Sequence, residues 1–81
     1  MKLKVIKQQL GELLAQFESG EAIDTSILAD IKVILQDKKI ACKHKLRHRV
    51  DFAKRERTEK KLKKVKACLK QLKSLEELAS R

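Results

Sequence analysis

Residues 38–66 read KKIACKHKLRHRVDFAKRERTEKKLKKVK, and this stretch decides whether the chain forms two helices or three. It has no glycine or proline, and it continues an apolar stripe at helical spacing through Cys42, Leu46 and Val50. The next apolar set starts at Leu62, about half a turn out of phase, because a helix advances about 100° per residue. The phase shift predicts either a turn near residues 54–59 or one long helix with two opposite apolar faces.

Local signals support both arrangements. The lack of Gly and Pro after residue 20 favours one helix from 25 to 79. Asp51 and Thr58 each have a side chain that can accept the free N–H groups of a new helix, which favours a turn. Neither is followed three residues later by the Glu or Gln of a capping box. We favour three helices, with KRERTEKK (residues 54–61) as the hinge between the second and the third.

The N-terminal half has clearer signals for where helices start and end. Apolar residues from Leu3 to Phe17 recur every three or four positions, as on one face of a helix. Ser19-Gly20 predicts the end of that helix, and Asp24-Thr25-Ser26 predicts the start of the next. Gly11 lies inside the first helix and costs it about 1 kcal/mol relative to Ala, so we expect a second helix to approach closely there.

These patterns predict an all-α protein with no strands. We expect residues 1–81 to form a single helical domain, with helices over about 2–18, 25–53 and 58–79. The architecture would be a small antiparallel bundle of three helices, or the first helix packed on one long helix.

Self-association is expected because the chain is short and has little bulk for a core. It has 81 residues, and its only aromatics are Phe17 and Phe52. A chain of this size buries only about 60% of its unfolded surface. Four apolar residues between positions 62 and 72 are spaced alternately three and four residues apart, as in the seam of a coiled coil. The residues predicted for the interface are Leu62, Val65, Leu69 and Leu72.

Positive charge is concentrated in the second half of the chain. The net formal charge of the whole chain is +10. Residues 1–37 contain four Lys and six acids, whereas residues 38–73 contain sixteen Lys or Arg and three acids. The i, i+4 pairs available to the basic stretch offset only three cations: Asp51–Arg55, Glu56–Lys60 and Glu59–Lys63. This asymmetry predicts a localised anionic partner rather than a solvated helix face alone.

Nucleic acid is the first candidate partner, because non-specific phosphate contacts need only Lys and Arg along a rigid face. We expect duplex DNA or structured RNA, because single-strand sites stack bases on aromatic residues and only Phe52 is available in the basic stretch. The residues predicted to bind are Lys43, Lys45, Arg47, Arg49, Lys54, Arg55, Arg57, Lys60, Lys61, Lys63 and Lys64. The alternative is a helical interaction module that docks an acidic protein within a larger assembly.

No pattern predicts catalysis. His44 and His48 share a helical face, but no third ligand follows at a suitable spacing and the flanking cations repel metal ions, so no metal or other cofactor is expected. Cys42 and Cys68 border apolar stripes, as buried thiols do. The sequence also has no signal peptide and no apolar run long enough for a membrane span. We therefore expect a non-enzyme inside the cell, in the cytoplasm, the nucleus or the nucleoid.

Overall fold

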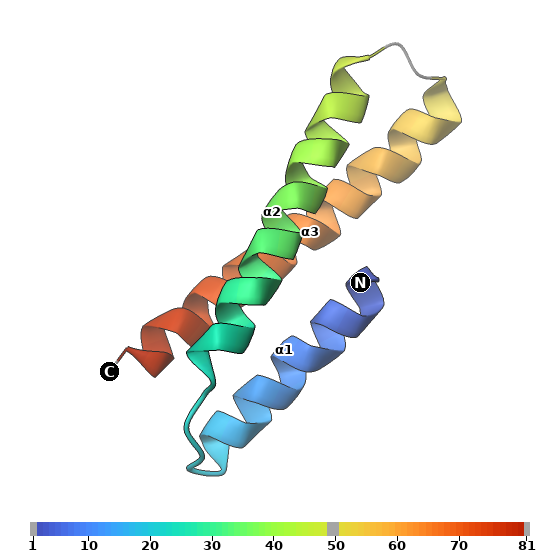
Figure 1. Cartoon of the computed structure of the whole chain (residues 1–81). Helices are drawn as coiled ribbons and strands as arrows, with labels where there is room; N and C mark the ends of the chain where they lie inside the picture. The colour runs from blue at the N-terminus through green and yellow to red at the C-terminus, as the bar shows by residue number, and fades with distance from the viewer. Residues whose placement is uncertain (1, 49–50, 81) are drawn as a thin grey trace.

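The computed structural model describes residues 2–48 and 51–80, and in these ranges it contains three helices and no strand. Helix α1 spans Leu3–Glu18, α2 spans Thr25–Arg47 and α3 spans Phe52–Ala79. Each helix runs antiparallel to the next, so α1 and α3 point in the same direction (Figure 1). The prediction of an all-α bundle of three helices is confirmed, and the alternative of one helix from 25 to 79 is wrong.

The first reversal of the chain lies where the sequence predicts it. The N–H of Gly20 donates to the carbonyl of Phe17, and the N–H of Glu21 donates to that of Gln16, each at 3.0 Å. These two bonds define a Schellman motif, which requires a left-handed residue just past the helix end. Gly20 supplies it with a φ of +91°.

An aspartate side chain caps each of the two later helices. Asp24 accepts the N–H of Ser26, and Asp51 accepts the N–H of Lys54, both at 2.9 Å. The cap at Asp51 starts α3 earlier than expected. The predicted end of the second helix near residue 53 and start of the third near 58 are therefore wrong. Val50, predicted on the apolar stripe of the second helix, lies outside the described residues.

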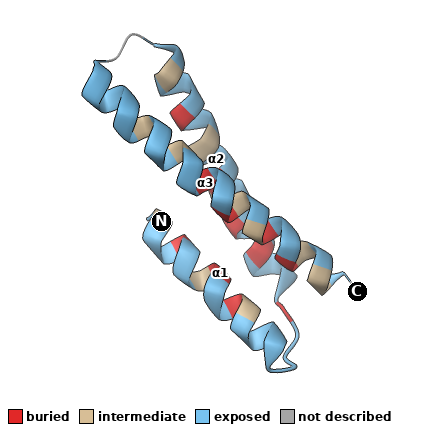
Figure 2. Ribbon diagram, turned by 180° about the vertical axis from the view of Figure 1, so that it is seen from behind, coloured by how far each residue is buried: buried red, intermediate tan, exposed pale blue. Residues whose placement is uncertain are grey.

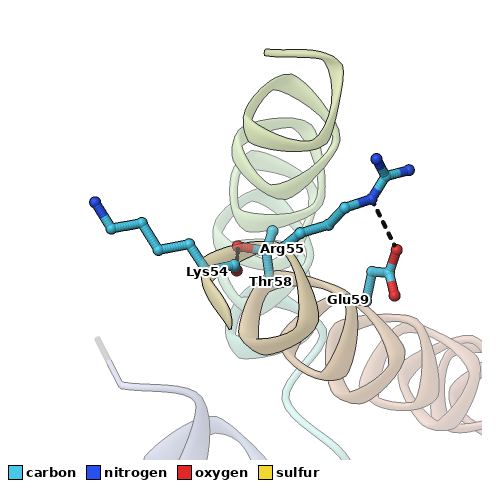
Figure 3. Close-up of polar contacts among 4 residues, drawn as sticks. All are labelled: Lys54, Arg55, Thr58 and Glu59. Carbon is cyan, nitrogen blue, oxygen red and sulfur yellow. Dashed lines mark hydrogen bonds and ion pairs between the residues drawn. The ribbon is translucent and has the colours of Figure 1, made fainter. Parts of the chain in front are cut away.

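The predicted hinge at residues 54–61 is also wrong, because this segment lies inside α3. The hydroxyl of Thr58 donates to the carbonyl of Lys54 at 2.9 Å, a bond within the helix rather than a cap (Figure 3). Two i, i+4 ion pairs span the segment, Arg55 Nε–Glu59 Oε1 at 3.3 Å and Lys60 Nζ–Glu56 Oε1 at 3.7 Å. Such pairs each stabilise a helix by a few tenths of a kcal/mol, so charge alone does not break the helix here.

The hydrophobic core lies where the three helices run side by side (Figure 2). Helix α3 contacts both α1 and α2, while α1 and α2 contact each other little. Phe17, expected on the apolar stripe of the first helix, remains more than one-third exposed, as does Ile27 of α2. The buried core residues are Ile6, Leu10, Leu13, Ile23, Leu28, Ile31, Leu35, Val65, Cys68, Leu72 and Leu75.

Beyond α1, the hairpin of α2 and α3 continues as a two-helix arm (Figure 1). The molecule is elongated as a result, with extents of 48 × 18 × 16 Å. We call the described residues of 43–66 the basic arm, two of whose members, Lys64 and Val65, already lie beside α1 and in the core. Cys42 is buried at its base but does not belong to the core cluster. The core therefore supports one end of the molecule, and the arm carries most of the excess charge at the other.

The two glycines are predicted to respond in opposite ways to replacement by alanine. Apart from its chain neighbours and the nearby backbone of its own helix, no described atom lies within 4 Å of the position that a Cβ on Gly11 would occupy, so the expected close approach of a second helix there is wrong. Gly11→Ala should raise the free energy of unfolding by about 1 kcal/mol, because Ala favours the helix. Gly20→Ala should lower it by about 1 kcal/mol, because Gly20 is left-handed.

Urea denaturation followed by circular dichroism measures both changes. A destabilised Gly11→Ala variant would show that α1 is crowded at this position, and a neutral Gly20→Ala variant would show that the Schellman turn does not form.

Candidate nucleic-acid interface

The basic arm brings cations from both of its helices around one hollow near its end. Lys45 of α2, with Lys54, Arg57 and Thr58 of α3, lines a space of about 420 Å³. The hollow therefore presents three positive charges, and none of its lining residues is acidic. The hydroxyl hydrogen of Thr58 is already donated to the carbonyl of Lys54. The groups that could bind an anion there are the two ammonium groups and the guanidinium.

The hollow forms because the core-facing stripe of α3 changes character along the helix. Residues three or four apart share a helical face, and the stripe runs from Val65 back through Lys61, Thr58 and Lys54. Leucines and valine in the core are thus replaced by polar side chains in the arm. None of these three polar side chains is fully buried, and the two helices spread apart toward this end (Figure 1).

Most of the predicted binding cations have no carboxylate partner. Within residues 2–48 and 51–80, only Arg55 and Lys60 of the predicted set form ion pairs. The expected Glu56–Lys60 pair forms, whereas Glu59 pairs with Arg55 and Asp51 caps α3. The remaining described members are exposed and unpaired: Lys43, Lys45, Arg47, Lys54, Arg57, Lys61, Lys63 and Lys64. Arg49 lies outside the described residues.

The sequence did not single out two further cations, Lys4 and Lys7. With Lys64, they line a second hollow, between α1 and α3. The net negative charge of residues 1–37 hid them, because it averages over six acids placed elsewhere. Their spacing of three residues, on one face of a helix, was the signal that could have found them.

The two histidines contact each other at the end of α2. The Nε2 atoms of His44 and His48 lie 2.9 Å apart, with the rings edge to face and their centroids 4.2 Å apart. In this contact one ring nitrogen donates and the other accepts, and the tautomers of the two rings decide which does which. The described part of the chain contains no cluster of three or more His, Cys, Asp or Glu that could hold a metal ion.

Both cysteines are free thiols buried in the chain, which agrees with a packing role. Burial raises the pKa of the Cys68 thiol above its ordinary value of 9.0, and the nearby Lys7 ammonium partly opposes this shift. A raised pKa keeps the thiol protonated and weakly nucleophilic at neutral pH. Cys68 is therefore a small apolar residue under ordinary conditions.

The seam predicted for self-association is used inside the chain. Val65 and Leu72 are 0% and 1% exposed in the core shared with α1 and α2. Leu62 and Leu69 are partly buried, and Leu69 packs against the same core. Val65 and Leu72 thus have no surface left for a second copy. Their assignment to an exposed interface is corrected, because α3 needs this stripe to hold the other helices. Self-association itself stays a prediction.

A pair of leucine variants tests this corrected role. Leu72→Ala should lower the free energy of unfolding by about 2–5 kcal/mol, because it leaves a cavity in the core. Leu62→Ala is the matched control and should cost clearly less, since its side chain is only partly buried. Chemical denaturation measures both. A Leu72→Ala variant with wild-type stability but a smaller mass by light scattering would restore the interface role.

Cys68 predicts a specific dependence of stability on pH. The unfolded thiol has the lower pKa, near 9.0, so the unfolded chain releases this proton first as pH rises. The stability contributed by protonated Cys68 is fully present below the unfolded pKa and is lost as pH rises through the folded pKa. As pH rises from below to above the unfolded pKa near 9.0, the wild-type protein should lose stability relative to Cys68→Ala in urea denaturation. Parallel pH profiles of the two proteins would contradict this.

Comparisons of the chain with known protein families, with curated proteins and with solved structures found no match. None of the described helices combines the length and the apolar character needed to cross a membrane. The arrangement of charge on the molecule is therefore the observation from which a function can be inferred.

Proposed function

We propose that this protein binds phosphate-rich nucleic acid, either duplex DNA or structured RNA, through the basic arm and without reading sequence. The observation that carries the proposal is the hollow at which Lys45, Lys54 and Arg57 meet from two helices. Phosphate oxygens accept hydrogen bonds from all three groups, and the planar guanidinium of Arg57 can bind two oxygens at once. Three converging cations with no lining acid favour an anion over a neutral ligand.

The dimensions of the arm suit a duplex. Lys54 and Lys64 are ten residues apart in α3, which is about 15 Å at 1.5 Å per residue. This length is comparable with the major groove of B-DNA, which is about 12 Å wide. Cations along one helix can therefore contact the phosphate rows on both sides of a groove without reaching the bases.

Repulsion within the arm also supports an anionic partner. Lys60 and Lys64 are like charges at i, i+4, an arrangement that destabilises a helix by a few tenths of a kcal/mol. The unpaired cations around the hollow add to this repulsion. A bound phosphate backbone would relieve it, so binding should stabilise the end of the arm. The proposal requires no metal, cofactor or catalytic step, and it places the protein inside the cell with its nucleic acid.

The second candidate is the docking of an acidic protein, and a separate surface favours it. Val33 and Ile40 of α2 are 59% and 66% exposed, and their spacing of seven residues places them on one side of the helix. A partner helix with acidic and apolar residues could contact this side and the basic arm together. The partner would then be an acidic component of a larger assembly.

A salt titration tests the first candidate. Labelled duplex DNA and an RNA hairpin are titrated with the protein at several salt concentrations. We expect log K to fall with log salt at about −0.9 per contacted phosphate. The triple variant Lys45→Gln, Lys54→Gln, Arg57→Gln should reduce the magnitude of this slope by about 0.9 for each phosphate that it no longer binds.

The matched control removes the same charge elsewhere, with Lys2→Gln, Lys70→Gln and Lys73→Gln on exposed positions away from the arm. Its slope should stay close to that of the wild type. Equal reductions of the slope in the two triple variants would show that net charge, and not the hollow, governs binding. The absence of binding to either nucleic acid at about 50 mM salt would reject the proposal and favour the acidic protein partner.

A further inference from the structure

The hollow between α1 and α3 differs in character from the one in the basic arm. It has a volume of about 410 Å³, within the range of about 300–1,000 Å³ typical of small-molecule sites. Leu3, Ala67 and the Cys68 thiol give it an apolar wall, whereas the residues that line the hollow in the arm are two lysines, an arginine and a threonine. We call it the α1–α3 groove. Its lining residues are Leu3, Lys4, Lys7, Lys64, Ala67, Cys68 and Gln71.

Three lysines surround this apolar wall. Lys4 and Lys7 come from one face of α1, and Lys64 comes from α3. None of the three forms an ion pair among the described residues, and no acid lines the groove. Lysine stems can lie along apolar surface while their ammonium groups stay at the rim. The groove therefore offers apolar contact and positive charge to the same ligand.

The start of α1 adds to the positive potential at one end of the groove. Leu3 and Lys4 are the first two residues of α1, and both line the groove. The N-cap residue, Lys2, makes no side-chain capping bond, and the first turn contains no acid. Free N–H groups and the helix dipole at such a terminus favour an anion. In α2 and α3, by contrast, Asp24 and Asp51 accept these hydrogen bonds.

We propose that the α1–α3 groove binds a small amphiphilic anion, a carboxylate with an unbranched apolar chain of medium length. The carboxylate would lie among Lys4, Lys7 and Lys64, and the chain would lie along Leu3, Ala67 and Cys68. This site shares Lys64 with the basic arm, but its other lining residues lie on α1 and on the part of α3 that packs against it.

The lining favours a small ligand over a helix of a partner protein. Lys64 and Gln71 are seven residues apart, so the groove is about 10 Å long at 1.5 Å per residue. Its apolar contacts come from Leu3, Ala67 and Cys68, which are fewer than a helix docking through its i, i+3, i+4 and i+7 side chains would use. A small inorganic anion, at the other extreme, would leave the apolar wall uncovered.

Calorimetric titration of the full chain with decanoate, decanol and acetate tests the proposal. Decanoate should bind once per chain and at least tenfold more tightly than decanol, which lacks the charge. Acetate, which lacks the chain, should not bind at the same concentrations. Bound decanoate should also slow the alkylation of Cys68, measured in a Cys42→Ala background.

Two variants separate the apolar wall from the charged rim. Ala67→Leu fills the groove from an exposed position of α3 and should weaken decanoate binding at least tenfold. Lys4→Gln with Lys7→Gln should weaken decanoate at least fivefold and leave decanol unchanged. The control, Lys70→Gln with Lys73→Gln, removes the same charge outside the groove and should bind decanoate as the wild type does.

Equal affinity for decanoate and decanol would overturn the proposal, and so would decanoate binding that is unchanged in a folded Ala67→Leu variant. Circular dichroism shows whether that variant is folded. If the Ala67→Leu variant is unfolded, the proposal is tested by the comparison of decanoate with decanol and by the double lysine variant. The variant Lys4→Gln with Lys7→Gln should retain its affinity for duplex DNA. A failure of the proposed carboxylate site can therefore be distinguished from a failure of nucleic-acid binding.

Discussion

The structure depends on the apolar stripe of α3. Val65, Leu72 and Leu75 are almost fully buried, and they belong to one cluster with residues of both α1 and α2. Because α1 and α2 contact each other little, α3 is their common partner. Burial of a leucine or valine side chain contributes about 1.5–3 kcal/mol, so a few such positions supply a large share of the stability of a chain this small. The stripe is therefore committed to folding, and this is why it is not free for self-association.

The core-facing stripe of α3 changes from apolar to polar side chains along the 28 residues of the helix. Toward its N-terminus, the stripe that buries Val65 continues with Lys61, Thr58 and Lys54, which add charge instead of apolar burial. This part of the helix depends on the Asp51 cap, worth about 1 kcal/mol, and on exposed ion pairs worth a few tenths each. The candidate interface thus lies in a part of the fold that a helix cap and exposed ion pairs stabilise instead of the apolar core, so a bound anion would add to its stability.

Both hollows occur where the core comes to an end. In the arm, the core ends because Lys54 and Thr58 replace apolar residues, and the resulting space is surrounded by charge. Beside α1, the space lies where that helix begins, and the small Ala67 faces it from α3. Its wall is apolar because Cys68 and Leu3 still belong to, or pack against, the core. One fold therefore produces two cationic sites, which differ in how much apolar surface lies beside the charge.

The sequence by itself determined the helical class, the first turn and most of the core. The turn at Gly20, the cap at Asp24 and the spacing of the apolar residues are local features, and local chemistry decides them. The second turn was misplaced because a change of apolar phase shows that two faces differ but not where the chain reverses. Only the tertiary structure decided which cations meet, because Lys45 joins Lys54 and Arg57 across a hairpin, and Lys7 joins Lys64 across two helices. Charge can be counted along a chain, but its convergence depends on how the helices pack.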